Sequence, residues 1–249
     1  MALVVIDAGH GGANPGAVYG GRREKDDVLA LSMEVGNILE RNGVDVYYTR
    51  TSDVYESPAQ KTEEANAVRG DYFVSIHRNS SPYPNQYTGV ESLVYNRYGE
   101  AARLAENINA RLEELGFANQ GVNERKDLVV LSGSQMPAVL TEVGFINSDS
   151  DNRLFDERFN DIAKAIADGI LATVWSSCGV APETGRGKWS GGGLSFWGWR
   201  RFSWESPDPG GLMGRDRRSL RGPYGWQAAL LWRSWQAHWQ RRSWKSTPE

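Results

Sequence analysis

The chain has 249 residues and one cysteine, Cys178, which excludes an intramolecular disulfide and a cysteine-rich zinc site. No run approaches 18 consecutive apolar residues, so no membrane span is expected, and the first apolar run is too short for a signal peptide. We therefore expect a protein made in the cytoplasm without a signal peptide. Because the chain has 3 histidines, a catalytic metal is expected to use histidine together with carboxylates.

The net charge of −3 conceals two segments of opposite sign. Residues 1–175 carry a net charge of −10, whereas residues 176–249 carry +7, nine of the ten tryptophans and no isoleucine. Such a shift in composition indicates two segments of different role. We therefore expect a complete domain at residues 1–175 and a basic, tryptophan-rich tail at residues 176–249.

Strands and helices alternate along the first segment. Short β-branched apolar runs predict strands, and apolar residues at three- and four-residue intervals predict helices. Strands are expected at 3–6, 44–49, 72–76, 90–95, 128–131 and 138–143. Helices are expected at 25–42, 58–68, 100–115 and 158–174. This alternation predicts an α/β fold with a mostly parallel sheet covered by helices on both faces.

Two histidines follow predicted strands at equivalent places. His10 lies in the glycine-rich turn after the first strand, and His77 directly follows the third. Because the carboxyl ends of parallel strands meet at one edge of a sheet, the two imidazoles are expected to converge. Two carboxylates are available at that edge, namely Glu24, just before the first long helix, and Glu142, at the end of the last strand.

Two imidazoles and one carboxylate are a common ligand set for catalytic zinc. Bound zinc lowers the pKa of a water molecule towards about 7, and a carboxylate that does not bind the metal can move its proton. The spacing leaves open whether Glu24 or Glu142 is the ligand. Two simpler interpretations also exist: Glu24 as a solvated acid in the first turn of a helix, and Glu142 as a partner in a structural ion pair.

Four motifs carry a resemblance to a known family. They are Asp7–Gly12 with Asn14–Ala17, Glu24–Asp26, Ser75–Ser80 and Thr141–Asn147. In this order, and spread over nearly all of residues 1–175, they closely resemble the zinc-dependent N-acetylmuramoyl-L-alanine amidases found in cell-wall autolysins and phage endolysins.

The resemblance implies a twisted sheet of about six strands flanked by helices, and it assigns roles. It implies that His10, Glu24 and His77 hold one zinc ion and that Glu142 is the catalytic acid/base. The implied reaction is hydrolysis of the peptidoglycan amide that joins the lactyl group of N-acetylmuramic acid to L-alanine of the stem peptide. The expected protein is an endolysin released by a holin, or a mother-cell lysin. The alternatives are a non-catalytic wall-binding protein on the same fold and a zinc peptidase acting within the stem peptide.

Two residues depart from the family's pattern. Asn14 stands where the family usually has aspartate, and Arg78 stands where a small residue is usual. Asn14 is expected to keep a hydrogen bond in the turn. Arg78 is expected to alter the charge of the groove and the substrate preference. Asn79 is expected to orient the loop or a substrate peptide, with a plain turn role as the alternative.

The tail contains one segment with helical spacing. Within Trp226–Trp244, Trp232, Trp235 and Trp239 fall at helical intervals with arginines between and after them. Such a helix suits an anionic membrane surface or wall polymer, with packing on the first domain as the alternative. A third interpretation is a shifted reading frame, in which case the tail is poorly ordered and dispensable for hydrolysis. No nucleic-acid partner is expected, and His238 is interpreted as a surface residue.

Overall fold

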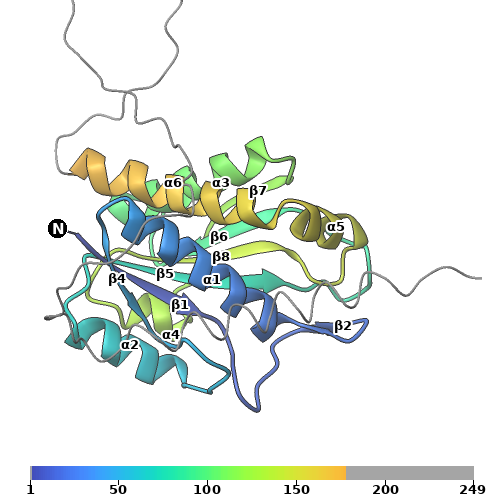
Figure 1. The fold of residues 1–249 in the computed structure, drawn as a ribbon, viewed down its shortest axis with the longest axis horizontal. Helices are drawn as coiled ribbons and strands as arrows, with labels where there is room; N and C mark the ends of the chain where they lie inside the picture. Colours follow the sequence, from blue (N-terminus) through green and yellow to red (C-terminus); the bar gives the residue numbers. More distant parts are fainter. Residues whose placement is uncertain (1, 178–249) are drawn as a thin grey trace, which may run out of the picture. The chain divides into compact units, whose positions relative to one another are not determined.

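A computed structural model describes residues 2–177 of the chain, so the expectations for Cys178, Trp226–Trp244 and His238 concern residues outside the described part. Six strands form one sheet in the order β4-β1-β5-β8-β6-β7 (Figure 1). In chain order these are β1 (Leu3–Ala8), β4 (Asp45–Tyr48), β5 (Tyr72–Asn79), β6 (Val90–Val94), β7 (Asn119–Glu124) and β8 (Ala138–Phe145).

The sheet is mostly parallel, as the alternation of strands and helices predicts. β1 pairs in parallel with β4 and β5, β5 pairs in parallel with β8, and β6 pairs in parallel with β7. The exception is the antiparallel pairing of β6 with β8, which reverses the last two strands and places Glu91 opposite Glu142. The carboxyl ends of β1, β5 and β8 therefore meet at one edge, together with the beginning of β6.

Helices cover both faces of the sheet (Figure 1). The larger layer holds α1 (Glu24–Arg41), α3 (Gly99–Glu114), α5 (Asp149–Glu157) and α6 (Phe159–Ser177). The smaller layer holds α2 (Pro58–Ala67) and α4 (Val129–Ser132). Local sequence explains where α2 begins. In α2, Ser57 and Gln60 form a reciprocal capping box and Pro58 occupies the first turn, where its missing N–H is not needed.

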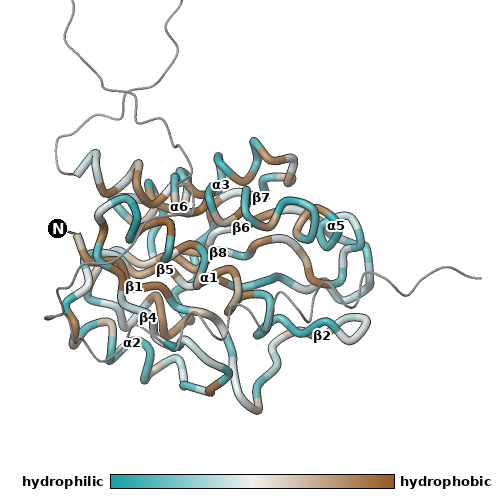
Figure 2. Tube along the Cα trace, in the orientation of Figure 1, coloured by the Kyte–Doolittle hydropathy of each residue, from teal (hydrophilic) through white to brown (hydrophobic). Residues whose placement is uncertain are grey.

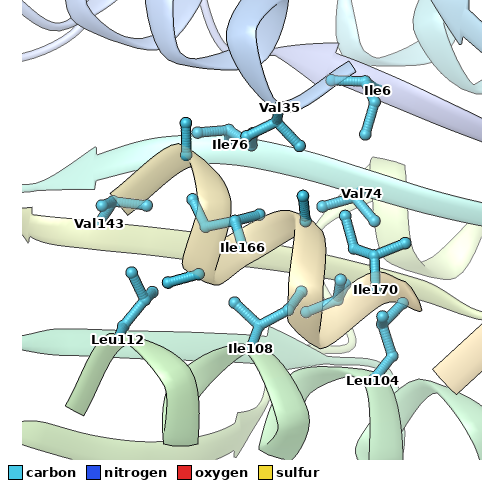
Figure 3. Packing of buried hydrophobic residues seen from close by; sticks show 14 of the residues in the cluster. Ile6, Val35, Val74, Ile76, Leu104, Ile108, Leu112, Val143, Ile166 and Ile170 are labelled. Atoms are coloured by element: carbon cyan, nitrogen blue, oxygen red, sulfur yellow. The ribbon is translucent and has the colours of Figure 1, made fainter. Parts of the chain in front are cut away.

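Alternation along the strands divides the core in two. In β1, Val4 and Ile6 face the larger layer, whereas Val5 faces the smaller one. Apolar residues accordingly lie on the inward sides of the helices (Figure 2). Ile166 and Ile170 of α6 pack between the sheet and α3 (Figure 3). Burying each such side chain contributes about 1.5–3 kcal/mol, so this layer fixes the sheet whose edge carries the site.

Several elements differ from the sequence-based expectations. The predicted strand at 128–131 is wrong, because Leu128 is the N-cap of helix α4 and the following residues lie in that helix. A four-residue apolar run does not distinguish a strand from a buried helical turn. The polar strand β7, helix α5 and a short hairpin formed by β2 (Val18–Tyr19) and β3 (Arg22–Arg23) were not predicted.

Helix α6 continues to Ser177, past the boundary expected near Trp175. The Ser177 hydroxyl lies 2.8 Å from the Tyr72 hydroxyl at the start of β5, so the end of α6 is part of the packed domain. None of the helices within residues 2–177 has the length and apolar character needed to cross a membrane.

Candidate active site

The candidate site lies at the edge where the carboxyl ends of β1, β5 and β8 meet. His10 follows β1 and has a φ of 58°, a left-handed conformation that is uncommon outside glycine and clusters at functional sites. His77 lies inside β5 rather than after it, because the strand continues to Asn79. Glu24 is the first residue of α1. The structure thus brings three separate segments to one place.

The side chains of His10, Glu24 and His77 converge as predicted. Each offers a ligand atom, and the three atoms lie within 4.8 Å of one another. His10 Nε2 is 3.0 Å from Glu24 Oε2, and His77 Nδ1 is 2.8 Å from Glu24 Oε1. The exposed fraction of Glu24 is only 3%, so the interpretation of this residue as a solvated acid is wrong.

The carboxylate of Glu24 is stabilised in its ionised form. Burial acts to raise its pKa, but hydrogen bonds with His10 and His77 outweigh burial and leave the pKa well below its usual range. The backbone N–H groups of Ala17 and Arg78 also donate to this carboxylate, at 2.9 and 3.0 Å. For His77, burial acts to lower the pKa, and the bond to Glu24 outweighs it, so the pKa of His77 is raised.

Asn14 orients the His10 imidazole. Its Oδ1 atom lies 3.2 Å from His10 Nδ1 and also accepts the backbone N–H of Gly16 at 3.1 Å. With Nδ1 held by Asn14, Nε2 is the ring atom that faces Glu24 and the one that would bind a metal. The expected hydrogen bond of Asn14 in the turn is confirmed, and the amide oxygen accepts as a carboxylate oxygen does.

Glycines let the three ligand side chains come together. A Cβ atom at Gly9 would clash with the His77 ring, and one at Gly16 would lie 2.5 Å from Glu24 Oε2. Gly16 also has a φ of +68°, which residues with a side chain rarely adopt. The motif glycines are therefore required by close packing around the ligand atoms. Compact nitrogen and oxygen donors in this arrangement fit a zinc ion.

A buried arginine that was not predicted as a site residue fixes the loops around the site. Arg50 donates to the carbonyl oxygens of Ala8, Gly9 and Lys25, at 3.0, 2.7 and 3.0 Å. Ala8 and Gly9 directly precede His10, and Lys25 directly follows Glu24. Arg50 therefore ties together the two backbone segments that carry His10 and Glu24.

Glu142 lies on β8, in register with His77 on β5. Burial raises the pKa of Glu142 to about 7; the carboxylates of Glu24 and Glu91 add to this, and His77 opposes it. Its Oε2 atom is buried without a hydrogen-bond partner, and no ion pair within residues 2–177 includes Glu142. The structural ion-pair interpretation is therefore wrong, and a carboxyl group with this pKa suits proton transfer near neutral pH.

Glu91 lies on β6, on the other side of Glu142, and was not predicted as a site residue. Asn123 Nδ2 donates to Glu91 Oε1 at 2.7 Å, and Asn79 Nδ2 donates to Oε2 at 3.3 Å. Asn79 Oδ1 accepts the backbone N–H of Ser80 at 2.8 Å, so Asn79 orients the loop as well as Glu91. The sequence signal was available, since Glu91 is an acid inside a predicted apolar strand, as Glu142 is.

The expectation that Arg78 alters the charge of the groove is wrong. Its side chain is fully buried, with Nη1 2.7 Å from Asp27 Oδ2 and Nε donating to the carbonyl oxygen of Val143 at 3.2 Å. The guanidinium carbon lies 4.3 Å from the centre of the Phe155 ring. Because successive strand residues point to opposite faces, a residue next to His77 points away from the site.

A sheet edge that brings two imidazoles and a carboxylate together is typical of metal-dependent hydrolases. The chain belongs to the N-acetylmuramoyl-L-alanine amidase family, which it matches over residues 4–172. The resemblance stated from the motifs, the α/β fold and the assignment as an enzyme acting on peptidoglycan are thereby confirmed.

Similar proteins include viral and bacterial enzymes. The chain is 38% identical to the endolysin of Bacillus phage SPP1 over 191 residues, which covers 73% of this chain and 70% of the endolysin. It is 36% identical to the sporulation-specific N-acetylmuramoyl-L-alanine amidase of Bacillus subtilis over 176 residues, covering 68% of this chain and 67% of that protein.

Solved structures of amidases share the fold of this chain. The amidase AmiC2 of Nostoc punctiforme is 36% identical, with a TM-score of 0.65 and coverage of 70% of this chain and 97% of that one. The catalytic domain of CwlV from Bacillus (Paenibacillus) polymyxa is 32% identical, with a TM-score of 0.64 and coverage of 72% and 99%.

Proposed function

We propose that His10, Glu24 and His77 hold one zinc ion and that Glu142 is the catalytic acid/base. The observation that carries this proposal is the convergence of three ligand atoms within 4.8 Å beside a carboxyl group whose Oε2 atom has no partner. A bound zinc ion would supply a Lewis acid for the scissile carbonyl and lower the pKa of a water molecule.

Glu142 would move the proton. Because its pKa of about 7 lies close to neutral pH, it can accept a proton from water and then donate it to the leaving nitrogen. The oxygen of the water bonds to the lactyl carbonyl carbon, the carbon–nitrogen bond breaks, and the nitrogen takes the proton. The nitrogen also takes up the second proton of the water, so the products are the lactyl carboxylate of N-acetylmuramic acid and a stem peptide that begins with an L-alanine ammonium group.

We assign hydrolysis to the first segment, which extends to Ser177 at the end of α6, and attachment to the remaining tail. Trp226–Trp244 would contact an anionic wall polymer or membrane surface, and no nucleic-acid partner is proposed. We further propose that the protein reaches the wall after a holin or lysis opens the membrane. The similarity to a phage endolysin supports this route.

Zinc content and product analysis test the proposal, with both the full chain and residues 1–177. We expect one zinc ion per chain and free N-terminal L-alanine from both. A new amino group within the stem peptide would instead indicate a zinc peptidase. Absence of product would indicate a wall-binding protein. If only the full chain yields product, the assignment of hydrolysis to the first segment fails.

The ligand assignment has a matched histidine control. His77→Ala should lower the zinc content well below one ion per chain, because two ligands hold zinc weakly. His238→Ala, which changes a histidine in the tail, should retain one zinc ion. Full zinc content in His77→Ala would remove His77 from the proposed ligand set.

A further inference from the structure

Glu91 and Glu142 face each other across neighbouring strands. They are register partners in the antiparallel pair formed by β6 and β8. Directly opposite residues in such a pair have Cβ atoms about 4.5–5.5 Å apart, and like charges at these positions destabilise the sheet. The fold therefore places two acids side by side on one face of the sheet.

The carboxylate of Glu91 is held in place without being neutralised. Asn123 and Asn79 donate to its two oxygens, and no ion pair within residues 2–177 includes it. Arg125 on the neighbouring segment is engaged by Asp127, through two hydrogen bonds of 2.9 and 2.8 Å. A carboxylate accepts up to about four hydrogen bonds, so a half-buried Glu91 retains capacity for another donor.

The position of Glu91 in the sheet indicates what this donor is. His77, Glu142 and Glu91 form a row across β5, β8 and β6. With the scissile carbonyl at the His77 end and the leaving nitrogen at Glu142, the departing peptide extends towards β6. We propose that Glu91 recognises this peptide by accepting its N–H and pairing with the ammonium group formed on cleavage, an inference that rests on the proposed function.

The charge of the leaving group makes the inference testable. Before cleavage the nitrogen is part of a neutral amide, whereas afterwards it is an α-amine with an ordinary pKa of about 8 and is protonated at pH 6.5. A charge-assisted hydrogen bond to a carboxylate is about twice as strong as a neutral one. The site should therefore prefer a peptide with a free N-terminal ammonium over the same peptide with a blocked N-terminus.

Calorimetric titration measures this preference directly. L-alanyl-D-isoglutamine and its N-acetylated form are titrated into the zinc-loaded full chain at pH 6.5. We expect the free peptide to bind about tenfold more tightly. Glu91→Gln should reduce this ratio to about one, whereas Glu124→Gln, at an exposed acid of β7, should keep it. A second titration after removal of zinc excludes direct binding of the amine to the metal.

A tenfold preference that persists in Glu91→Gln would overturn the inference. Should Glu91→Gln fail to fold, Asn123→Ala tests the same point, because it removes the 2.7 Å bond that holds the carboxylate. The expected result is a reduced preference, and an unchanged one would again overturn the inference. Hydrolysis of N-acetylmuramoyl-L-alanyl-D-isoglutamine by the full chain separates the two proposals, since failure of this reaction contradicts the proposed function itself.

Discussion

Asp7 on β1 and Glu142 on β8 are both carboxyl groups inside apolar strands of one sheet, but their surroundings are opposite. Asp7 is 1% exposed and fully partnered. Its Oδ1 atom accepts from Lys61 and Thr49 at 2.6 and 2.7 Å, and its Oδ2 atom accepts from Ser75 at 2.6 Å. Glu142, by contrast, has a buried Oε2 atom without a partner.

The two pKa values follow from this difference. Burial acts to raise the pKa of Asp7, but the charge and hydrogen bond of Lys61 outweigh it, so the pKa is lowered. Burial of Glu142 is not compensated, and its pKa rises to about 7. A buried acid whose oxygens are all partnered stays ionised, whereas one with an unpartnered oxygen beside ligand atoms can exchange a proton with a substrate.

The largest effect is expected on catalysis, from substitution of Glu142, whose Oε2 atom has no partner. Glu142→Gln should lower kcat/KM for peptidoglycan fragments by about 10²- to 10⁴-fold, because the amide cannot accept the proton of water. One zinc ion per chain should remain bound. Steady-state kinetics and zinc analysis measure both, with Glu124→Gln as an acid-to-amide control. A near-normal rate in Glu142→Gln would remove this residue from the mechanism.

At Asp7, whose carboxylate oxygens all have partners, we expect a loss of stability instead. Lys61→Met should lower the free energy of unfolding by about 3–5 kcal/mol, because it leaves Asp7 buried without its cation. Denaturant unfolding measures the change. Lys126→Met, at an exposed lysine, should change the free energy by no more than about 0.5 kcal/mol. Equal effects of the two substitutions would contradict the prediction that Asp7 needs Lys61 as its partner.

A smaller effect, on zinc affinity, is expected from Asn14, which orients the His10 ring. Asn14→Ala should weaken zinc binding about 10- to 100-fold, because the His10 ring loses the partner that fixes its tautomer. Asn14→Asp keeps an acceptor at the same place and should bind zinc at least as tightly as the unmodified chain. Competition with a chelator measures the affinities. Unchanged affinity in Asn14→Ala would show that the ring is fixed by packing alone.

The smallest effect concerns pH. The pKa of Glu142 is raised on folding. The free energy of unfolding therefore falls as the pH rises from the ordinary pKa of a glutamate through about 7. Glu142→Gln should therefore stabilise the zinc-free protein by about 1–3 kcal/mol at pH 8 and leave its stability unchanged at pH 4. Unfolding at both pH values tests this, and a gain of the same size at pH 4 would contradict it.

The sequence predicts which residues form the site better than it predicts the role of each. His10 and His77 could be placed because each follows an apolar run that ends at the same sheet edge. The roles of Glu24 and Glu142 came from the resemblance alone, since spacing does not show hydrogen bonds. What distinguishes these two acids is whether imidazoles surround the carboxylate, and that depends on packing between segments far apart in the chain.

Other differences come from tertiary context. A four-residue apolar run such as 128–131 fits a buried strand and a buried helical turn equally well, so the pattern does not distinguish the two. β7 is held by pairing with β6 and lacks the alternation that marks a half-buried strand. Arg78 carries a charge, which suggests an exposed position, but Asp27 and Phe155 make its burial tolerable.

The composition of β7 has a consequence for association between molecules. This strand is the outermost of its side of the sheet, and its sequence from Asn119 to Glu124 contains one apolar residue, Val122. Gly121 has a φ of +89°, and the pairing with β6 shifts register after Val90. A polar, irregular edge is a poor template for a strand from another chain. The features that hid β7 from sequence-based prediction thus disfavour edge-to-edge aggregation at this side of the sheet.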